Sequence, residues 1–252
     1  MKPGRYIVLI LLFISAIVKA GENTVTFDSA NAAYAKGKYE QAIQLYNSIL
    51  ESGQESADLY FNLGNAYFKS NGNGKAILSY ERAKKLAPDD EDIAVNLKMA
   101  YQRTEDKIEA APQLFLSEWK NGLSDIMSEK EWSIFVIALI CIGLAFIAVY
   151  IVSGNRILRQ VGFYLGSVLI IISVFSYFLA RNKYNSTINS ASAIILSPSV
   201  TVNGSPSEKG TKLFILHEGV KVDVTGEENG WTEIRIANGN VGWVKSGSLE
   251  QI

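Results

Sequence analysis

Residues 60–88 read YFNLGNAYFKSNGNGKAILSYERAKKLAP, and the small and aromatic residues of this segment predict the fold of the N-terminal part of the chain. Related residues recur 34 positions apart, at the pairs Ala30/Gly64, Asn31/Asn65, Ala42/Ala76, Tyr46/Tyr80 and Ile49/Ala83. A period of 34 residues is typical of a helix-turn-helix repeat. Small residues at such positions let helices approach closely, and tyrosine rings fill the space between them. The sequence therefore predicts an all-α array of helix-turn-helix units.

The second copy of the period resembles the tetratricopeptide (TPR) consensus at Tyr60, Leu63, Gly64, Tyr67, Ala76, Tyr80, Ala83 and Pro88. The resemblance implies a TPR domain at 23–105, with repeats at about 23–56 and 57–90 and a cap helix at 91–105. The acidic residues 89–92 suit the first turn of that cap helix, because negative charge is favoured at a helix N-terminus. A cation site is the rarer alternative for these acids, so we predict no metal ligands.

In TPR proteins the first helix of each repeat lines a groove that binds a partner. The corresponding side chains here are Asn31, Tyr34, Asn62, Asn65, Phe68, Lys69, Asn96 and Arg103. Asn31 with Asn65, and Asn62 with Asn96, are each one period apart. An amide can donate to and accept from an extended peptide backbone at once, so we expect this face to bind a segment of a partner protein. Ordinary solvated surface is the alternative.

The first twenty residues have the pattern of a secretory signal peptide. Lys2 and Arg5 precede an apolar stretch, and Val18-Lys19-Ala20 is a cleavage site of small-residue type. The apolar stretch is shorter than the roughly 20 residues that normally cross a membrane. We therefore expect residues 1–20 to be cleaved, with an uncleaved anchor as the alternative.

Two uncharged apolar runs, 132–152 and 161–180, each reach the length that a bilayer requires. The intervening residues 153–160 contain Arg156 and Arg159 but no acid, which predicts a cytoplasmic turn. With an exported N-terminus, this pattern predicts a two-helix transmembrane hairpin in a bacterial inner membrane. The domains on either side of the hairpin are then periplasmic.

Residues 106–131 are predicted to link the TPR domain to the hairpin through an amphipathic helix in the membrane interface. The apolar residues that recur at helical spacing there are Phe115, Trp119, Leu123, Ile126 and Met127. Packing of this helix against the TPR cap is the alternative.

From about residue 190 the pattern changes to short alternating runs typical of strands, and Asn238-Gly239 predicts a two-residue hairpin turn. The order of Leu213, Leu216, His217, Gly219, Gly230, Trp231, Gly239, Gly242 and Trp243 resembles the bacterial SH3 (SH3b) domain. This resemblance implies a small all-β barrel at 190–252. It also implies a candidate ligand surface at Trp231, Trp243 and His217. Both tryptophans also fit the barrel core, which is the preferred interpretation.

Charge and composition argue against several classes of function. The formal net charge of −1 becomes −4 without the predicted signal peptide, which leaves 21 basic and 25 acidic residues and does not favour nucleic acid. The single cysteine, Cys141, and the single histidine, His217, cannot form a disulfide or a Cys/His zinc cluster within one chain. Cys141 lies in an apolar run and is expected to be an ordinary buried residue. With no catalytic motif in the sequence, we expect no enzyme activity and no cofactor.

The complete order of signal, TPR repeats, two spans and SH3b domain resembles the BatE family of aerotolerance operons. The resemblance implies a membrane-bound scaffold that works beside partners with von Willebrand-type domains and a MoxR-type ATPase. Its role would lie in an envelope or oxidative-stress complex. An envelope sensor or cell-wall-binding protein that acts through the SH3b domain is the alternative function.

Overall fold

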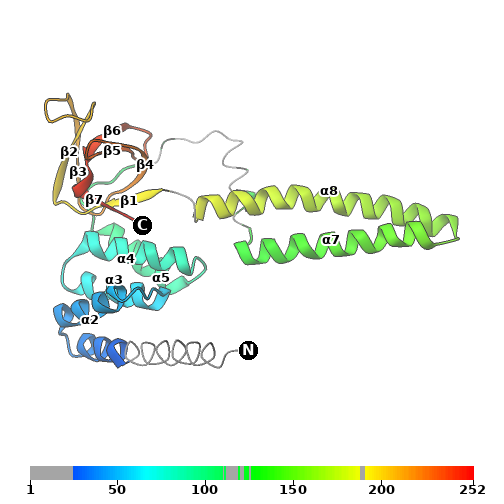
Figure 1. Cartoon of the computed structure of the whole chain (residues 1–252), viewed down its shortest axis with the longest axis horizontal. Helices are drawn as coiled ribbons and strands as arrows, with labels where there is room; N and C mark the ends of the chain where they lie inside the picture. Colours follow the sequence, from blue (N-terminus) through cyan, green and yellow to red (C-terminus); the bar gives the residue numbers. More distant parts are fainter. Residues whose placement is uncertain (1–24, 110, 112–118, 120–121, 125, 188–190) are drawn as a thin grey trace, which may run out of the picture. The chain divides into compact units, whose positions relative to one another are not determined.

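The computed structural model describes residues 25–252 apart from 110, 112–118, 120–121, 125 and 188–190 (Figure 1). The predicted signal peptide at 1–20 lies outside these residues. The chain falls into two compact units, one formed by the residues up to Ala110 together with Ala191–Ile252, and the other by Ala111–Ser190. The segments on either side of the apolar helices therefore belong to one unit.

The N-terminal part of the first unit is an array of antiparallel helices. A helix at residues 25–35 is followed by α2 (Tyr39–Glu51), α3 (Ala57–Lys69), α4 (Asn73–Leu86) and α5 (Glu91–Gln102). The Ser56 hydroxyl accepts the backbone N–H of Leu59, and the Asp90 carboxylate accepts those of Asp92 and Ile93, so α3 and α5 begin at capped ends. The predicted all-α helical repeat is confirmed.

Small and aromatic residues alternate where the helices pack. Tyr46 and Tyr80 are each only 1% exposed, and the core around them contains fully buried alanines at positions 30, 42, 76 and 83. A Cβ atom added to Gly64 would lie 2.7 Å from the ring of Tyr80, so glycine leaves the room that this ring occupies. The period of the sequence therefore reflects close contact between helices.

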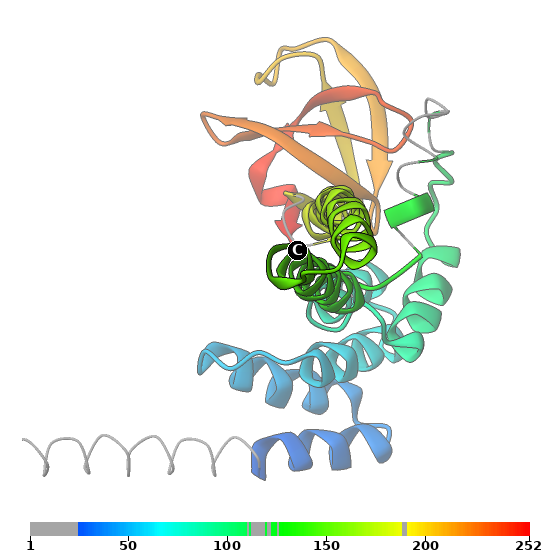
Figure 2. The same cartoon turned by 90° about the vertical axis from the view of Figure 1, so that its right-hand side faces the viewer.

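The C-terminal part of the first unit is a curled antiparallel sheet (Figure 2). Its strands are β1 (Ser192–Ile195), β2 (Ser199–Asn203), β3 (Lys212–His217), β4 (Lys221–Glu228), β5 (Trp231–Arg235), β6 (Val241–Lys245) and β7 (Leu249–Gln251). They are ordered β3-β2-β6-β5-β4-β1-β7. Ile195, Val202, Ile234 and Val244 are fully buried in the interior of the sheet. This arrangement confirms the predicted small all-β, SH3-like domain.

The hairpin turns differ in detail from the prediction. In the β5–β6 hairpin, Ile236 donates its N–H to the carbonyl of Asn240 over 3.0 Å, so the loop has three residues and not two. Gly239 takes a φ of +89° at the end of that loop. The two-residue turn lies instead between β4 and β5, where Asn229 and Gly230 have φ values of +49° and +80°.

The sheet packs against helix α4 within the first unit. Ile77 of α4 and Ile194 of β1 are both fully buried and share one apolar cluster with Leu97 of α5. A Cβ atom added to Gly219, which precedes β4, would lie 2.9 Å from Cδ1 of Ile77. The helical array and the sheet thus share a continuous core, although the chain leaves the unit between them.

The second unit consists mainly of two apolar helices that lie side by side, α7 (Glu129–Val152) and α8 (Arg156–Thr187) (Figure 1). A Cβ atom added to Gly162 would lie 2.6 Å from the carbonyl oxygen of Phe146, so this glycine permits the close approach. Both helices are long and apolar enough to cross a membrane. Their apolar side chains face outward, with Ile137 62% exposed and Ile171 68% exposed.

The connection between these helices is shorter than predicted. Residues 153–155 link them, because α8 already begins at Arg156 and not after residue 160. The Asn155 side chain explains this early start, since its Oδ1 accepts the backbone N–H of Ile157 over 2.8 Å. Cys141 is exposed on the surface of the helix pair, which corrects the expectation that it is buried.

Most of the predicted interfacial helix lies outside the described residues. Within the described part, residues 122–124 are helical, and Trp119 and Ile126 are 57% and 65% exposed. The indole Nε1 of Trp132 donates to the carbonyl of Ser124 over 2.9 Å, which holds this segment against the start of α7.

Candidate functional site

The four asparagines of the predicted groove form one ladder across three helices. Asn62 Nδ2 donates to Asn31 Oδ1 over 3.2 Å, and Asn96 Nδ2 donates to Asn65 Oδ1 over 2.8 Å. Asn62 and Asn65 are three residues apart on α3 and therefore lie on the same face of that helix. These four residues are called the asparagine ladder below. Its hydrogen bonds join residues 31 positions apart and not the residues one repeat period apart.

Two buried tyrosines of the second helices support the ladder. The Tyr46 hydroxyl donates to Asn31 Oδ1 over 2.6 Å, and the Tyr80 hydroxyl donates to Asn65 Oδ1 over 2.7 Å. Burial raises the pKa of Tyr46 to about 12 and also raises the pKa of Tyr80, so both hydroxyls remain protonated donors. Each of the two asparagine oxygens thus accepts two hydrogen bonds, which occupies both of its lone pairs.

The other two asparagines keep their oxygens available. Asn62 and Asn96 are half-buried, and no other described residue donates a hydrogen bond to their Oδ1 atoms. Neither oxygen is among the fully buried, unpaired polar atoms of the described chain. These two oxygens can therefore accept hydrogen bonds from a bound backbone, and the Nδ2 groups of Asn31 and Asn65 supply donors beside them.

The remaining residues of the predicted groove lie in or just after the last turns of the first helices. Arg103 sits over the Phe68 ring, 3.6 Å from its centroid, and also donates to the Phe68 carbonyl over 3.3 Å. Tyr34 packs against Tyr39, with 5.4 Å between ring centroids. Lys69 is exposed in the last turn of α3. The structure thus joins Phe68 to Arg103 and places Tyr34 beside the inter-helix turn.

The two tryptophans of the β domain are not part of its core. Trp231 and Trp243 are half-buried on β5 and β6, where the alternate residues Ile234 and Val244 point into the apolar interior. The strand register places Trp231 opposite Lys245. The preferred core interpretation is therefore wrong, and the tryptophans lie on the outer face of the sheet.

His217 does not join the tryptophans. The strand register places it opposite Ser199 at one end of β2, whereas Trp243 lies opposite Asn203 at the other end. These two positions on β2 are about 13 Å apart at the usual rise per strand residue. The candidate surface of Trp231, Trp243 and His217 is therefore not one site.

His217 contacts the segment that follows the helical array instead. Its Nδ1 lies 3.0 Å from Asp106 Oδ1, and its backbone N–H donates to Asp106 Oδ2 over 2.7 Å. Glu105 lies 3.5 Å from the other ring nitrogen. The hydrogen bond to Asp106 raises the pKa of His217, which favours the protonated ring at this contact.

A second polar contact between the array and the sheet was not predicted from the sequence. Glu81 of α4 accepts from Lys221 of β4 over 2.8 Å and from the Tyr101 hydroxyl over 2.6 Å. Arg82 donates to Glu250 over 2.9 Å, beside the end of the chain. Helix α4 therefore contributes both its apolar face and adjacent charged residues to this contact.

Family comparisons identify two domain types in the chain. The tetratricopeptide repeat family matches residues 27–91, and the bacterial SH3 domain family matches residues 200–250. No curated protein matches the chain. The first match covers the helices from residue 27 to the start of α5, and the second covers most of the β sheet. These two domains support a protein-interaction or cell-wall-binding role.

Proposed function

We propose that this protein is a membrane-anchored scaffold whose TPR array binds an extended segment of a partner protein. The asparagine ladder carries the proposal, because it presents amide donors and acceptors across three neighbouring helices. A row of amides suits the alternating N–H and C=O groups of an extended backbone. The chain acts by binding and not by catalysis. Its single histidine is engaged by Asp106, and its single cysteine lies on an apolar helix.

The hairpin anchors the scaffold in a bacterial inner membrane. Apolar side chains cover the outward surface of α7 and α8, as expected where lipid is the solvent. The contact between Glu81 and Lys221 joins residues on either side of the hairpin, which supports placing both domains on one side of the membrane. Arg156 and Arg159 favour a cytoplasmic connection and hence periplasmic domains.

Cysteine labelling tests this topology in a Cys141→Ala background. A reagent that cannot cross the membrane should modify a cysteine placed at the exposed Lys209 in intact cells, and should modify one placed at Asn155 only after the membrane is opened. The reverse pattern would place the domains in the cytoplasm.

The partners that we propose are Bat-type membrane proteins with von Willebrand-type domains, in an envelope or oxidative-stress complex. The support is the order of modules along the chain, since the matched TPR and SH3 regions flank two apolar helices as in the BatE family.

Asn62 and Asn96 are the residues to change, because Asn31 and Asn65 also support buried tyrosines. In cells that express the full chain, cross-linked partners are captured from native membranes and quantified by mass spectrometry. Asn62→Ala with Asn96→Ala should reduce capture of groove partners roughly threefold to tenfold, as loss of neutral hydrogen bonds predicts.

Asn47→Ala is the matched control. Asn47 is a half-buried asparagine of α2 that makes one side-chain hydrogen bond, to Tyr67. This variant should capture partners at the wild-type level. Equal capture by all variants would show that the asparagine ladder is ordinary solvated surface. Capture of only those proteins that lack von Willebrand-type domains would refute the proposed Bat-type partners.

Cell-wall binding by the β domain is the second candidate, and the outward position of Trp231 and Trp243 favours it. Aromatic rings on the outer face of a sheet can stack on sugar and peptide groups. If this function is correct, the full chain in detergent should sediment with insoluble peptidoglycan, and Trp243→Ala should abolish the sedimentation. Retention in the supernatant would leave the protein scaffold as the function.

A further inference from the structure

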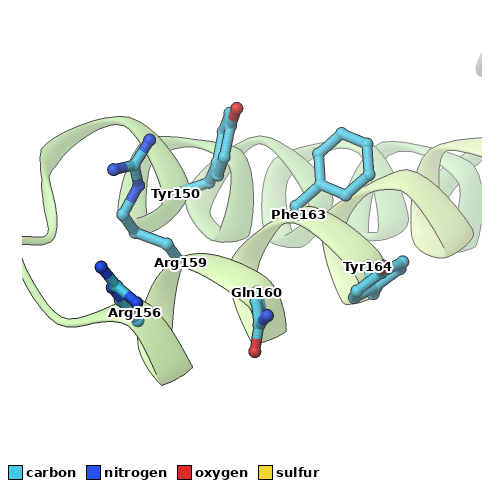
Figure 3. Close-up of a pocket in the computed structure, with 6 residues that line it drawn as sticks. All are labelled: Tyr150, Arg156, Arg159, Gln160, Phe163 and Tyr164. Carbon is cyan, nitrogen blue, oxygen red and sulfur yellow. The ribbon is translucent and has the colours of Figure 1, made fainter.

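A hollow of about 320 Å³ lies where the two apolar helices are connected (Figure 3). Tyr150 of α7 borders it together with Arg156, Arg159, Gln160, Phe163 and Tyr164 of α8. Figure 3 shows Arg159 rising beside Tyr150, with Arg156 next to it at the connection. The guanidinium of Arg159 is 5.5 Å from the centroid of the Tyr150 ring. Two guanidinium groups and an amide thus share one small hollow with three aromatic rings.

Among the described residues, no acidic side chain pairs with either arginine. The sequence contains no aspartate or glutamate from residue 132 to residue 187. Two cations that border one hollow repel each other, and an anion bound there offsets that repulsion. Because guanidinium groups bind phosphate in a bidentate manner, a phosphate group is the anion that this arrangement fits.

The position of the hollow favours a lipid as the source of the phosphate. The hollow lies at the shared end of two helices that are long enough to cross a membrane. Tyrosine rings are enriched at the level of the headgroups, and Tyr164 is 66% exposed here. Phe163, 46% exposed, adds an apolar wall beside the arginines. A free phosphate ion gains nothing from that wall, whereas the glycerol and acyl part of a lipid does.

We propose that this hollow binds the phosphate headgroup of an anionic phospholipid, such as phosphatidylglycerol, through Arg156 and Arg159. The site rests on the proposed membrane hairpin. A bound lipid of this kind offsets part of the positive charge of the connection and fixes the depth of the helix pair in the membrane.

The test uses the full chain in a mild detergent, and native mass spectrometry measures the binding of added lipids. We expect phosphatidylglycerol to bind several-fold more tightly than phosphatidylcholine. Binding should weaken roughly fivefold for each arginine replaced, in Arg159→Gln and in Arg156→Gln with Arg159→Gln. Arg181→Gln is the matched control, because Arg181 lies near the other end of α8, where it donates to the Tyr177 hydroxyl. This variant should bind phosphatidylglycerol as the wild type does.

Several outcomes would overturn the proposal. An equal loss for Arg181→Gln would mean that any basic residue attracts the lipid, and equal binding of phosphatidylcholine would remove the selectivity for anions. Binding of inorganic phosphate that depends on Arg156 and Arg159, without binding of phosphatidylglycerol, would identify a free-phosphate site. Extraction of cell membranes with alkaline carbonate distinguishes a failure of the headgroup site from a failure of the proposed membrane hairpin. Release of the chain refutes the membrane hairpin, whereas retention without lipid selectivity refutes only the headgroup site.

Discussion

Asn65→Ala is expected to destabilise the helical array through the tyrosine beneath it. Asn65 Oδ1 accepts the Tyr80 hydroxyl over 2.7 Å and Asn96 Nδ2 over 2.8 Å. Tyr80 is 1% exposed, so water does not replace the lost acceptor. Leaving a buried donor unsatisfied costs about 1–3 kcal/mol of the free energy of unfolding. The substitution therefore tests whether the ladder is structural at this position as well as available to a partner.

A double-mutant cycle isolates the contact. Tyr80→Phe alone removes one hydrogen bond and leaves Asn65 Oδ1 with its second donor, Asn96 Nδ2, at a cost of about 0.5–1.5 kcal/mol. Combined with Tyr80→Phe, Asn65→Ala no longer leaves an orphan hydroxyl. The double variant should therefore lose less stability than the two single variants added together, by about 1 kcal/mol.

Urea unfolding of the full chain in detergent, followed by far-ultraviolet circular dichroism, measures these changes. Asn47→Ala again serves as the control, because its hydrogen bond to Tyr67 is longer, at 3.3 Å. If Asn65→Ala lowers the free energy of unfolding no more than Asn47→Ala does, the reasoning is refuted. Strict additivity in the cycle would also refute it, because the hydroxyl and the amide would then act independently.

Three further predictions concern packing and pH. Gly64→Ala should cost about 1–3 kcal/mol in the same urea titration, because its methyl group overpacks the Tyr80 ring. Gly219→Ala should reduce hydrogen-exchange protection of β1, because this glycine has a φ of +87° and touches α4; unchanged protection would contradict the packing. The raised pKa of His217 means that its protonated form stabilises the contact with Asp106. This contribution to stability is fully present below a pH of about 6.5 and is lost as the pH rises through the raised pKa of His217. The urea concentration at the midpoint of unfolding should therefore fall over that pH range, and His217→Gln should abolish this fall.

The sequence predicted the helical array well, because the packing that forms it is local and repeats. The period of the sequence does not predict the hydrogen bonds that the asparagines make within the array. The sequence predicts that Asn31 and Asn65 line the groove, yet each also accepts a hydrogen bond from the hydroxyl of a tyrosine 15 residues later. That spacing occurs in both repeats, at Tyr46 and Tyr80, so the signal was present in the sequence. The 34-residue period by itself predicts only a packing role for a tyrosine on the second helix and does not indicate its hydrogen bond.

The position of Trp231 on the outer face of the sheet could also be predicted from its strand. Trp231 alternates with the buried residues Thr232 and Ile234 and shares the phase of Glu233 and Arg235. The two-residue period of a strand therefore predicts that Trp231 lies on the polar face of the sheet. The preference of large apolar rings for the interior favours the core, and this preference gives the wrong answer here.

The contact between the array and the sheet could not be predicted. Lys221 pairs with Glu81, which lies 140 residues earlier, and His217 pairs with Asp106, which lies 111 residues earlier. Single charged residues in alternating strands give no indication of a distant partner. The short connection before Arg156 was also missed, because the length of a helix beyond its apolar part depends on a local cap at Asn155.

The shared core of α4 and β1 also constrains how the chain is made. Lys221, which pairs with Glu81, lies 140 residues later in the sequence. At a synthesis rate of about 5–20 residues per second, it is made roughly 7–28 s after Glu81. During that interval the apolar side of α4 around Ile77 has no sheet to cover it. Nascent chains are therefore most exposed to aggregation or chaperone capture after α4 has formed and before the last domain emerges. A ribosome that stalls within the hairpin would leave a product in which this apolar face of α4 is uncovered.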